Sequence, residues 1–131
     1  MNPSQPATKP AGWHLVRSFG FAIRGIGILL RTQANARIHL AATIVVVAAG
    51  FLGKLSWGEW SAIVAAVGLV WTAEGLNTAI EAVVDLVSPE YHALAGRAKD
   101  VAAGAVLCAA IAAAIIGVLI FGPRILMLFQ R

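Results

Sequence analysis

The stretch EGLNTAIEAVVD, residues 74–85, places three carboxylates and one amide inside an otherwise apolar part of the chain. Its four polar members follow one another at intervals of three or four residues: Glu74, Asn77, Glu81 and Asp85. At about 100° per helical residue they fall within about 80° of arc, so they form one polar stripe on a helix face. The preceding stretch, WSAIVAAVGLVWTA, is almost wholly apolar. Because charge in or beside a membrane helix is costly and usually faces a functional interior, this stripe is a candidate functional site.

The composition of the 131-residue chain is that of an integral membrane protein. Hydrophobic residues make up 60% of the chain, charged residues only 12%, and the mean hydropathy is +0.83, far too apolar for a soluble domain. The length accommodates three spans and no second domain. The first twelve residues contain no apolar run typical of a signal peptide. Their Pro, Ser and Thr content predicts a disordered tail at 1–12, followed by a single domain at 13–131.

Residues 13–32 are expected to form an amphipathic helix in the headgroup plane of the membrane. Three arginines recur there every seven residues and so line one helical stripe: Arg17, Arg24 and Arg31. Apolar side chains lie largely away from that stripe, which is typical of helices that bind a membrane surface. The alternative is a water-facing helix packed on the membrane bundle.

Three membrane spans are expected to follow, at about residues 36–55, 58–87 and 100–121. The second is about 45 Å long, against about 30 Å of hydrocarbon, so one of its ends should protrude. Pro89 is expected to stop the second span, and Pro123 the third. The predicted fold is an all-α membrane protein with an N-terminal surface helix and three transmembrane helices.

The basic residues orient the chain in the membrane. Seven of the ten lysines and arginines lie before the first span or between the second and third, and three lie on the other side. The positive-inside rule therefore puts the N-terminus in the cytoplasm, and with it the acidic end of the second helix, where nucleotides are available. The same placement excludes a nucleic-acid-binding protein, because the charge flanks membrane segments and no basic patch with interleaved aromatics is present.

The polar stripe offers two carboxylates for two separate tasks. Glu74 and Glu81 are about 10.5 Å apart along the helix axis, too far to share one proton or one metal ion. One could hold Mg²⁺ on a nucleotide, while the other polarises a nucleophile deeper in the membrane. Asn77 lies between them and could orient either. Lys99 could neutralise a phosphate, and its neighbour Asp100 is placed to cap the third helix.

A structural interpretation stays open for the same residues. Acids on one helix face can pair across the bundle with Arg37, Arg97 or Lys99. His39 is expected to be an interfacial hydrogen-bonding residue, and His92 can be a helix cap. The chain has no CxxC or HExxH motif for zinc and no GxxxxGK[ST] loop, so any nucleotide is held without a P-loop.

The stretch EGLNTAIEAVVD, followed by SPEYH and AGRAKD, closely resembles bacterial integral-membrane diacylglycerol and undecaprenol kinases. The pattern E-x-x-N-[ST]-A-I-E-x-x-V-D…E-Y-H…A-K-D is long and specific to that family, and the similarity covers about residues 13–121. The resemblance implies a homotrimer of three-span subunits in the bacterial inner membrane. It also implies transfer of the ATP γ-phosphate to the hydroxyl of a membrane lipid, with Mg²⁺ and without a P-loop.

The resemblance implies roles for individual residues as well. Glu74 matches the proposed general base of the family, and Glu81 matches a metal-ligating glutamate. Six positions match the surroundings of the nucleotide: Asn77, Asp85, Glu90, His92, Lys99 and Asp100. Asn35 and Arg37 are expected at the lipid substrate. Gln33 lies where the family often has a second metal-ligating glutamate, and an amide there binds Mg²⁺ less strongly.

Undecaprenol is the favoured lipid, with diacylglycerol second, because NARIHL and DLVSPEYH look more like the undecaprenol kinase branch. Two other functions stay open. The acidic stripe could belong to a proton- or cation-conducting membrane oligomer. Alternatively, the substitution at position 33 could mark a catalytically impaired member of the family.

Overall fold

The structure, a computed structural model, describes the backbone of residues 11–130 and the side chains of 16–127, 129 and 130. These residues form four helices: α1 Ala11–Thr32, α2 Ala34–Leu52, α3 Trp57–Val87 and α4 Ala93–Phe129. The predicted disordered tail lies outside the described residues except for its last two, which are helical because α1 begins at Ala11.

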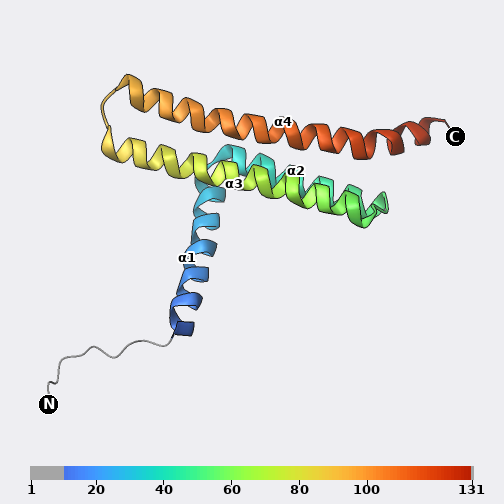
Figure 1. Ribbon diagram of the computed structural model, residues 1–131, viewed down its shortest axis with the longest axis horizontal. Coiled ribbons are helices and arrows are strands. Elements are labelled where there is room, and N and C mark those ends of the chain that lie inside the picture. Colours follow the sequence, from blue (N-terminus) through green and yellow to red (C-terminus); the bar gives the residue numbers. More distant parts are fainter. Residues whose placement is uncertain (1–10, 131) are drawn as a thin grey trace, which may run out of the picture.

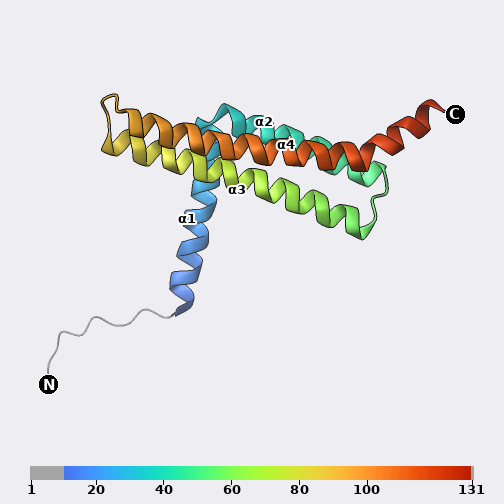
Figure 2. The same ribbon diagram turned by 45° about the horizontal axis from the view of Figure 1, so that its top comes forward.

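The three later helices run side by side, and α1 projects away from them (Figures 1 and 2). Short connections make neighbouring helices antiparallel, so α3 runs back along α2 and α4 runs back along α3. Each of these three is long and apolar enough to cross a membrane. The predicted all-α class, with an N-terminal helix and three apolar spans, is confirmed, and the direction of α1 suits a helix lying along a membrane surface.

The start of α4 differs from the predicted one. The connection after α3 is short, and α4 begins at Ala93 because His92 caps it: the His92 Nδ1 accepts a hydrogen bond from the backbone N–H of Leu94 at 3.2 Å. The interpretation of His92 as a helix cap is therefore confirmed. The prediction that Asp100 caps this helix is wrong, since Asp100 lies about two turns inside it.

The end of α4 also differs, because the helix continues past the predicted stop at Pro123 to Phe129. A proline inside a helix removes one backbone N–H and pushes against the preceding turn. Figure 2 shows the last turns of α4 bending away from the bundle. Just after this proline, the Arg124 guanidinium donates to the carbonyl of Ile120 at 2.7 Å. The proline therefore bends the helix instead of ending it.

One stripe of α3 faces the interior of the bundle. Its buried members recur every three or four residues, as one face of a helix requires: Ile63, Ala66, Val70, Glu74 and Asn77. At one end of the stripe, Ile63 belongs to a small hydrophobic core with Leu55 and Ile120. Large apolar side chains cover much of the outside of the bundle, as expected for helices in contact with lipid. The polar part of the stripe lies towards the opposite end of α3 from this core.

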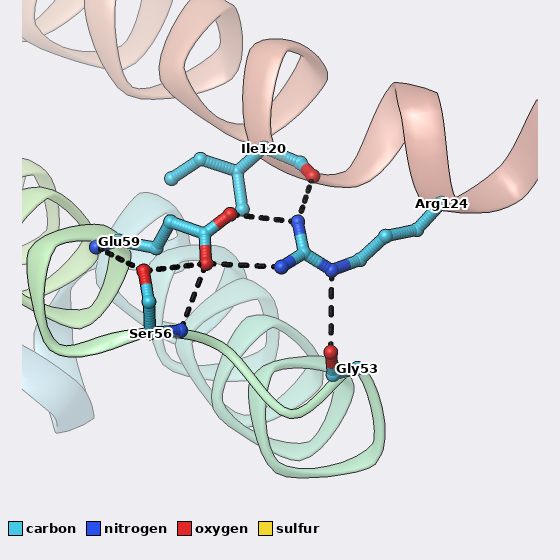
Figure 3. A network of polar contacts seen from close by, with 5 residues as sticks. All are labelled: Gly53, Ser56, Glu59, Ile120 and Arg124. Carbon is cyan, nitrogen blue, oxygen red and sulfur yellow. Dashed lines mark hydrogen bonds and ion pairs between the residues drawn. The ribbon is translucent and has the colours of Figure 1, made fainter.

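A polar network fastens the end of the bundle that holds the core (Figure 3). Ser56 caps α3 through reciprocal hydrogen bonds with Glu59, a capping box. The Glu59 carboxylate also accepts two N–H groups of the Arg124 guanidinium, at 2.8 and 2.9 Å. Arg124 Nε donates to the carbonyl of Gly53 at 3.2 Å. This network, the Glu59–Arg124 clasp, ties the start of α3 and the preceding turn to the end of α4.

Candidate active site

Glu74 is the largest side chain that is almost fully buried among the described residues, with 1% of its surface exposed. It lies on the inward stripe of α3, and its Oε2 has no hydrogen-bond partner among the described residues. A buried carboxyl group without a partner is costly to a fold. The burial and the free oxygen therefore make Glu74 the first candidate for a functional residue.

An open cleft of about 290 Å³ gives access to this carboxyl group. Glu74, Asn77 and Glu81 line the cleft from α3, while Asn35 and His39 line it from α2. Aliphatic side chains of α4 complete its wall. The two residues of α2 are one helical turn apart, so they face the cleft from the same side of their helix. The structure thus gathers four predicted site residues, three from the acidic stripe and one predicted at the lipid.

Asn77 holds the second carboxylate in place. Its Nδ2 donates to Oε1 of Glu81 at 3.2 Å. Asn77 is itself 7% exposed, and its Oδ1 has no partner in the described part of the chain. Glu81 is half-buried, about two turns along α3 from Glu74. The cleft is therefore lined by one carboxylate that Asn77 holds and by a second acid, Glu74, whose Oε2 is buried without a partner in the described part of the chain.

The outermost acid of the stripe forms an ion pair. Lys99 Nζ lies 2.5 Å from Asp85 Oδ1 and joins the end of α3 to the start of α4. The Asp85 side chain is 65% exposed, so this surface pair contributes little to stability. The predicted possibility that Asp85 pairs with Lys99 is therefore confirmed. Among the described residues, neither Glu74 nor Glu81 has an ion-pair partner.

The other predicted site residues lie outside the cleft of their own chain. Arg37, Glu90 and Asp100 are exposed, and His92 is the cap of α4. Gln33 occupies the N-cap position of α2, where its side chain makes no capping hydrogen bond. A single chain thus presents these groups on its surface, where a nucleotide or a second chain can reach them.

The carboxylates of the cleft suit a metal ion that arrives with its nucleotide. No group of three His, Cys, Asp or Glu side chains within residues 16–127, 129 and 130 could enclose an ion. Mg²⁺ keeps several waters and is usually bound by one or two carboxylates plus the phosphates of the nucleotide. Glu81, half-buried and oriented by Asn77, offers such a carboxylate.

His39 is the cleft residue that sequence reasoning placed at the membrane interface. A signal was present, because Asn35 and His39 are four residues apart near the polar start of an apolar helix and so share a face. Which way that face turns depends on how α2 packs against α3. A hydrogen bond from Trp71 Nε1 to Thr43 Oγ1, at 3.2 Å, joins these two helices, and such a contact cannot be read from local sequence.

Comparison with known proteins identifies the family to which the chain belongs. A family model of prokaryotic diacylglycerol kinases matches residues 20–121, which include every residue of the cleft. The undecaprenol kinase of Bacillus subtilis is 47% identical over 83% of this chain and 89% of the relative. The diacylglycerol kinases of Synechocystis and Escherichia coli K12 are 41% and 36% identical, over 94% and 77% of this chain and 78% and 83% of those relatives. The chain therefore belongs to the prokaryotic diacylglycerol kinase family, whose members are membrane lipid kinases.

Proposed function

We propose that this protein transfers the γ-phosphate of ATP to the hydroxyl of undecaprenol at the cytoplasmic face of the bacterial inner membrane. The observation that carries the proposal is the buried carboxyl oxygen of Glu74, without a partner among the described residues, in an open cleft between apolar helices. Identity of 47% to an undecaprenol kinase, against 41% to a diacylglycerol kinase, supports undecaprenol as the lipid, with diacylglycerol as the second candidate.

In the proposed reaction Glu74 acts on the lipid hydroxyl. Its Oε2 accepts the hydroxyl proton while the hydroxyl oxygen forms a bond to the γ-phosphorus. The bond from that phosphorus to the β–γ bridging oxygen breaks, and ADP leaves. A carboxylate suits this role when it is shielded from water and not already engaged, as this oxygen is within the described chain.

The other polar residues are proposed to serve the nucleotide. Glu81 holds Mg²⁺, which neutralises charge on the phosphates, and Asn77 orients that carboxylate. Gln33 approaches the same ion as a weaker, neutral ligand. Residues near the α3–α4 connection surround the nucleotide: Asp85, Glu90, His92, Lys99 and Asp100. Asn35 and Arg37 contact the polar end of the lipid.

A homotrimer is proposed because the cleft of one chain does not gather all of these groups. Arg37, Glu90 and Asp100 are exposed on their own chain. A neighbouring subunit packed against the bundle can bring such groups to the cleft, so that each site is built from two chains.

Transfer of labelled phosphate in mixed micelles tests the proposed activity. The purified protein receives γ-labelled ATP and Mg²⁺, with undecaprenol and dioleoylglycerol offered separately. We expect label in undecaprenol phosphate, and a loss of about 10²–10⁴-fold in kcat for Glu74→Gln, the range for removal of a general base. Label in neither lipid, with the protein folded by circular dichroism, contradicts the proposal.

Substitutions of the two carboxylates are expected to impair different steps of the reaction. Glu74→Gln should leave Mg·ATP affinity nearly unchanged, because Glu74 faces the lipid. Glu81→Gln should weaken Mg·ATP binding as well as transfer, because its carboxylate is assigned to the metal. Titration with a fluorescent ATP analogue separates these cases. Equal losses of nucleotide affinity in the two variants would show that the division of roles is wrong.

A further inference from the structure

A second cavity, of about 310 Å³, lies beside the cleft and opens along one side of the bundle. All three apolar helices line it, mostly with small and aliphatic side chains such as Val46, Ile63 and Ala114. The residues His39 and Ala110 line both this cavity and the cleft of Glu74, so the two spaces adjoin. An apolar compartment therefore begins where the polar cleft ends.

The order of residues along α3 shows how the cavity and the cleft are arranged along the helix axis. The cavity is lined at intervals from Ile63 to Trp71, and the cleft from Glu74 to Glu81. The cavity thus extends about 16 Å along the helix axis from Glu74 towards the core end of the bundle. A lipid alcohol whose hydroxyl reaches Glu74 would carry its first carbons into this space.

The polar groups in the cavity wall are engaged with one another. Trp71 Nε1 donates to Thr43 Oγ1 at 3.2 Å, and Thr43 Oγ1 donates to the backbone carbonyl of His39 at 2.7 Å. These bonds use the indole N–H and the threonine hydroxyl proton. On the side of His39 away from Glu74, the wall therefore offers a ligand aliphatic contacts and no hydrogen-bond donor from these two side chains.

We infer that this cavity binds the first isoprenoid units of a polyprenol substrate and selects against diacylglycerol. The inference rests on the proposed lipid kinase activity and adds to it the place and the physical basis of lipid choice. An apolar cavity of about 150 Å³ holds one benzene-sized molecule, so this one has room for about two such fragments, the size of two isoprene units. The rest of the chain leaves through the open side into the membrane.

The same wall is a poor match for diacylglycerol. In a 1,2-diacylglycerol the two carbons that follow the hydroxyl-bearing carbon each carry an ester group, and these esters would have to enter the cavity next to His39. Ester carbonyls lose their hydrogen bonds to water on entering an apolar space, and this is costly unless a donor replaces them. A polyprenol has only hydrocarbon there and makes no such demand.

Two alanines of α4 provide a matched test of the cavity. Ala114 lines it, whereas Ala112 does not, and both are exposed on the isolated chain. We expect Ala114→Leu to lower kcat/KM for undecaprenol by about tenfold or more, the scale on which pockets discriminate by methylene groups. The KM for Mg·ATP should not change. Ala112→Leu adds the same side chain outside the cavity and should leave kcat/KM close to the wild-type value.

A second variant tests selectivity without filling the cavity. Thr43→Val keeps the volume but removes the acceptor of the Trp71 N–H, which then becomes free to donate to an ester carbonyl. We expect the ratio of kcat/KM for undecaprenol to that for dioleoylglycerol to fall by about tenfold, which corresponds to one lost or gained hydrogen bond. Ser61→Ala removes a comparable hydroxyl, bonded to the carbonyl of Trp57 on the exposed side of α3, and should leave the ratio unchanged.

The outcomes separate this inference from the proposed function. A wild-type protein that phosphorylates neither lipid, or only dioleoylglycerol, overturns the proposed undecaprenol kinase activity and the inference with it. A wild-type protein active on undecaprenol whose Ala114→Leu and Ala112→Leu variants behave alike overturns the inference only. If Ala114→Leu does not fold, as judged by circular dichroism and gel filtration, the Thr43→Val ratio decides: an unchanged ratio overturns the inference.

Discussion

At the scale of single residues, Glu74 combines a cost to folding with a chemical use. Burying a polar group without a partner costs about 1–3 kcal/mol, and Oε2 of Glu74 is in that position within the described chain. The same free oxygen is the group proposed to accept a proton from the lipid. Functional sites commonly keep such unfavourable groups, so stability and activity oppose each other here.

Replacing this carboxyl group with a hydrocarbon should therefore stabilise an inactive protein. We expect Glu74→Leu to raise the Tm in detergent by about 2–5 °C, since about 1 kcal/mol corresponds to a few degrees for a chain of this size. Phosphate transfer should be lost. Glu81→Leu is the control, because it breaks the hydrogen bond with Asn77 and should not raise the Tm. A fall in Tm for Glu74→Leu would mean that the carboxyl group is satisfied in the assembled protein.

The sequence predicted the positions of some site residues and not of others, for a physical reason. The burial of Glu74 and Asn77 follows from helical periodicity, because both share a face with Val70 and Ile63. The place of His39 in the cleft does not follow, since it depends on the rotation of α2 against α3. Gln33 lies at the N-cap of α2 and does not line the cleft of its own chain. Its role as a metal ligand therefore stays a prediction.

At the scale of helices, the Glu59–Arg124 clasp joins the start of α3 to α4 directly after Pro123. The Ser56-x-x-Glu59 spacing is a capping-box signature that local sequence contains. The partner Arg124 is far away along the chain, and it follows the proline that was expected to end the helix. The local sequence therefore predicts the start of α3 well. It predicts the continuation of α4 past Pro123 poorly, because Arg124 contacts a residue that is distant in sequence.

Removing either side chain of the clasp should loosen this end of the bundle. We expect Arg124→Gln and Glu59→Gln each to lower the Tm, because the two-pronged contact between guanidinium and carboxylate is lost. The double variant should lose less stability than the sum of the two single losses, since both changes break one shared contact. Strictly additive losses in a thermal-unfolding cycle would show that the two side chains do not act together.

At the scale of the whole molecule, most of the bundle surface is apolar while much of the predicted nucleotide site is exposed. Large side chains such as Leu86, Val101 and Leu119 face outwards, as helices do that contact lipid or other subunits. Composition predicts the membrane class, and the order of apolar stretches along the chain predicts the number of spans. The complete site could not be predicted, because several of its expected residues, such as Glu90 and Asp100, do not line the cleft of their own chain.

A mixing experiment addresses the shared site. Asp100 is exposed and does not line the cleft that contains Glu74 in its own chain. We expect Glu74→Gln and Asp100→Asn to be inactive separately, and to recover part of the activity when the two variants are unfolded together and reconstituted as mixed oligomers. Each variant treated alone in the same way is the control. No recovery in mixtures that native mass spectrometry shows to be mixed would mean that each chain builds its own site.

The order of synthesis also determines when the Glu59–Arg124 clasp can form. Synthesis runs from the N-terminus, so the carboxylate of Glu59 is made before its cationic partner, which lies 65 residues later in the chain. Ser56, its other hydrogen-bond partner, is already made at that stage. The partner arrives with the turns of α4 that follow residue 121, where the match to the family model ends. We expect ribosome-stalled chains released before Arg124 to keep α3 and α4 loosely paired, and so to be the forms that membrane proteases remove first.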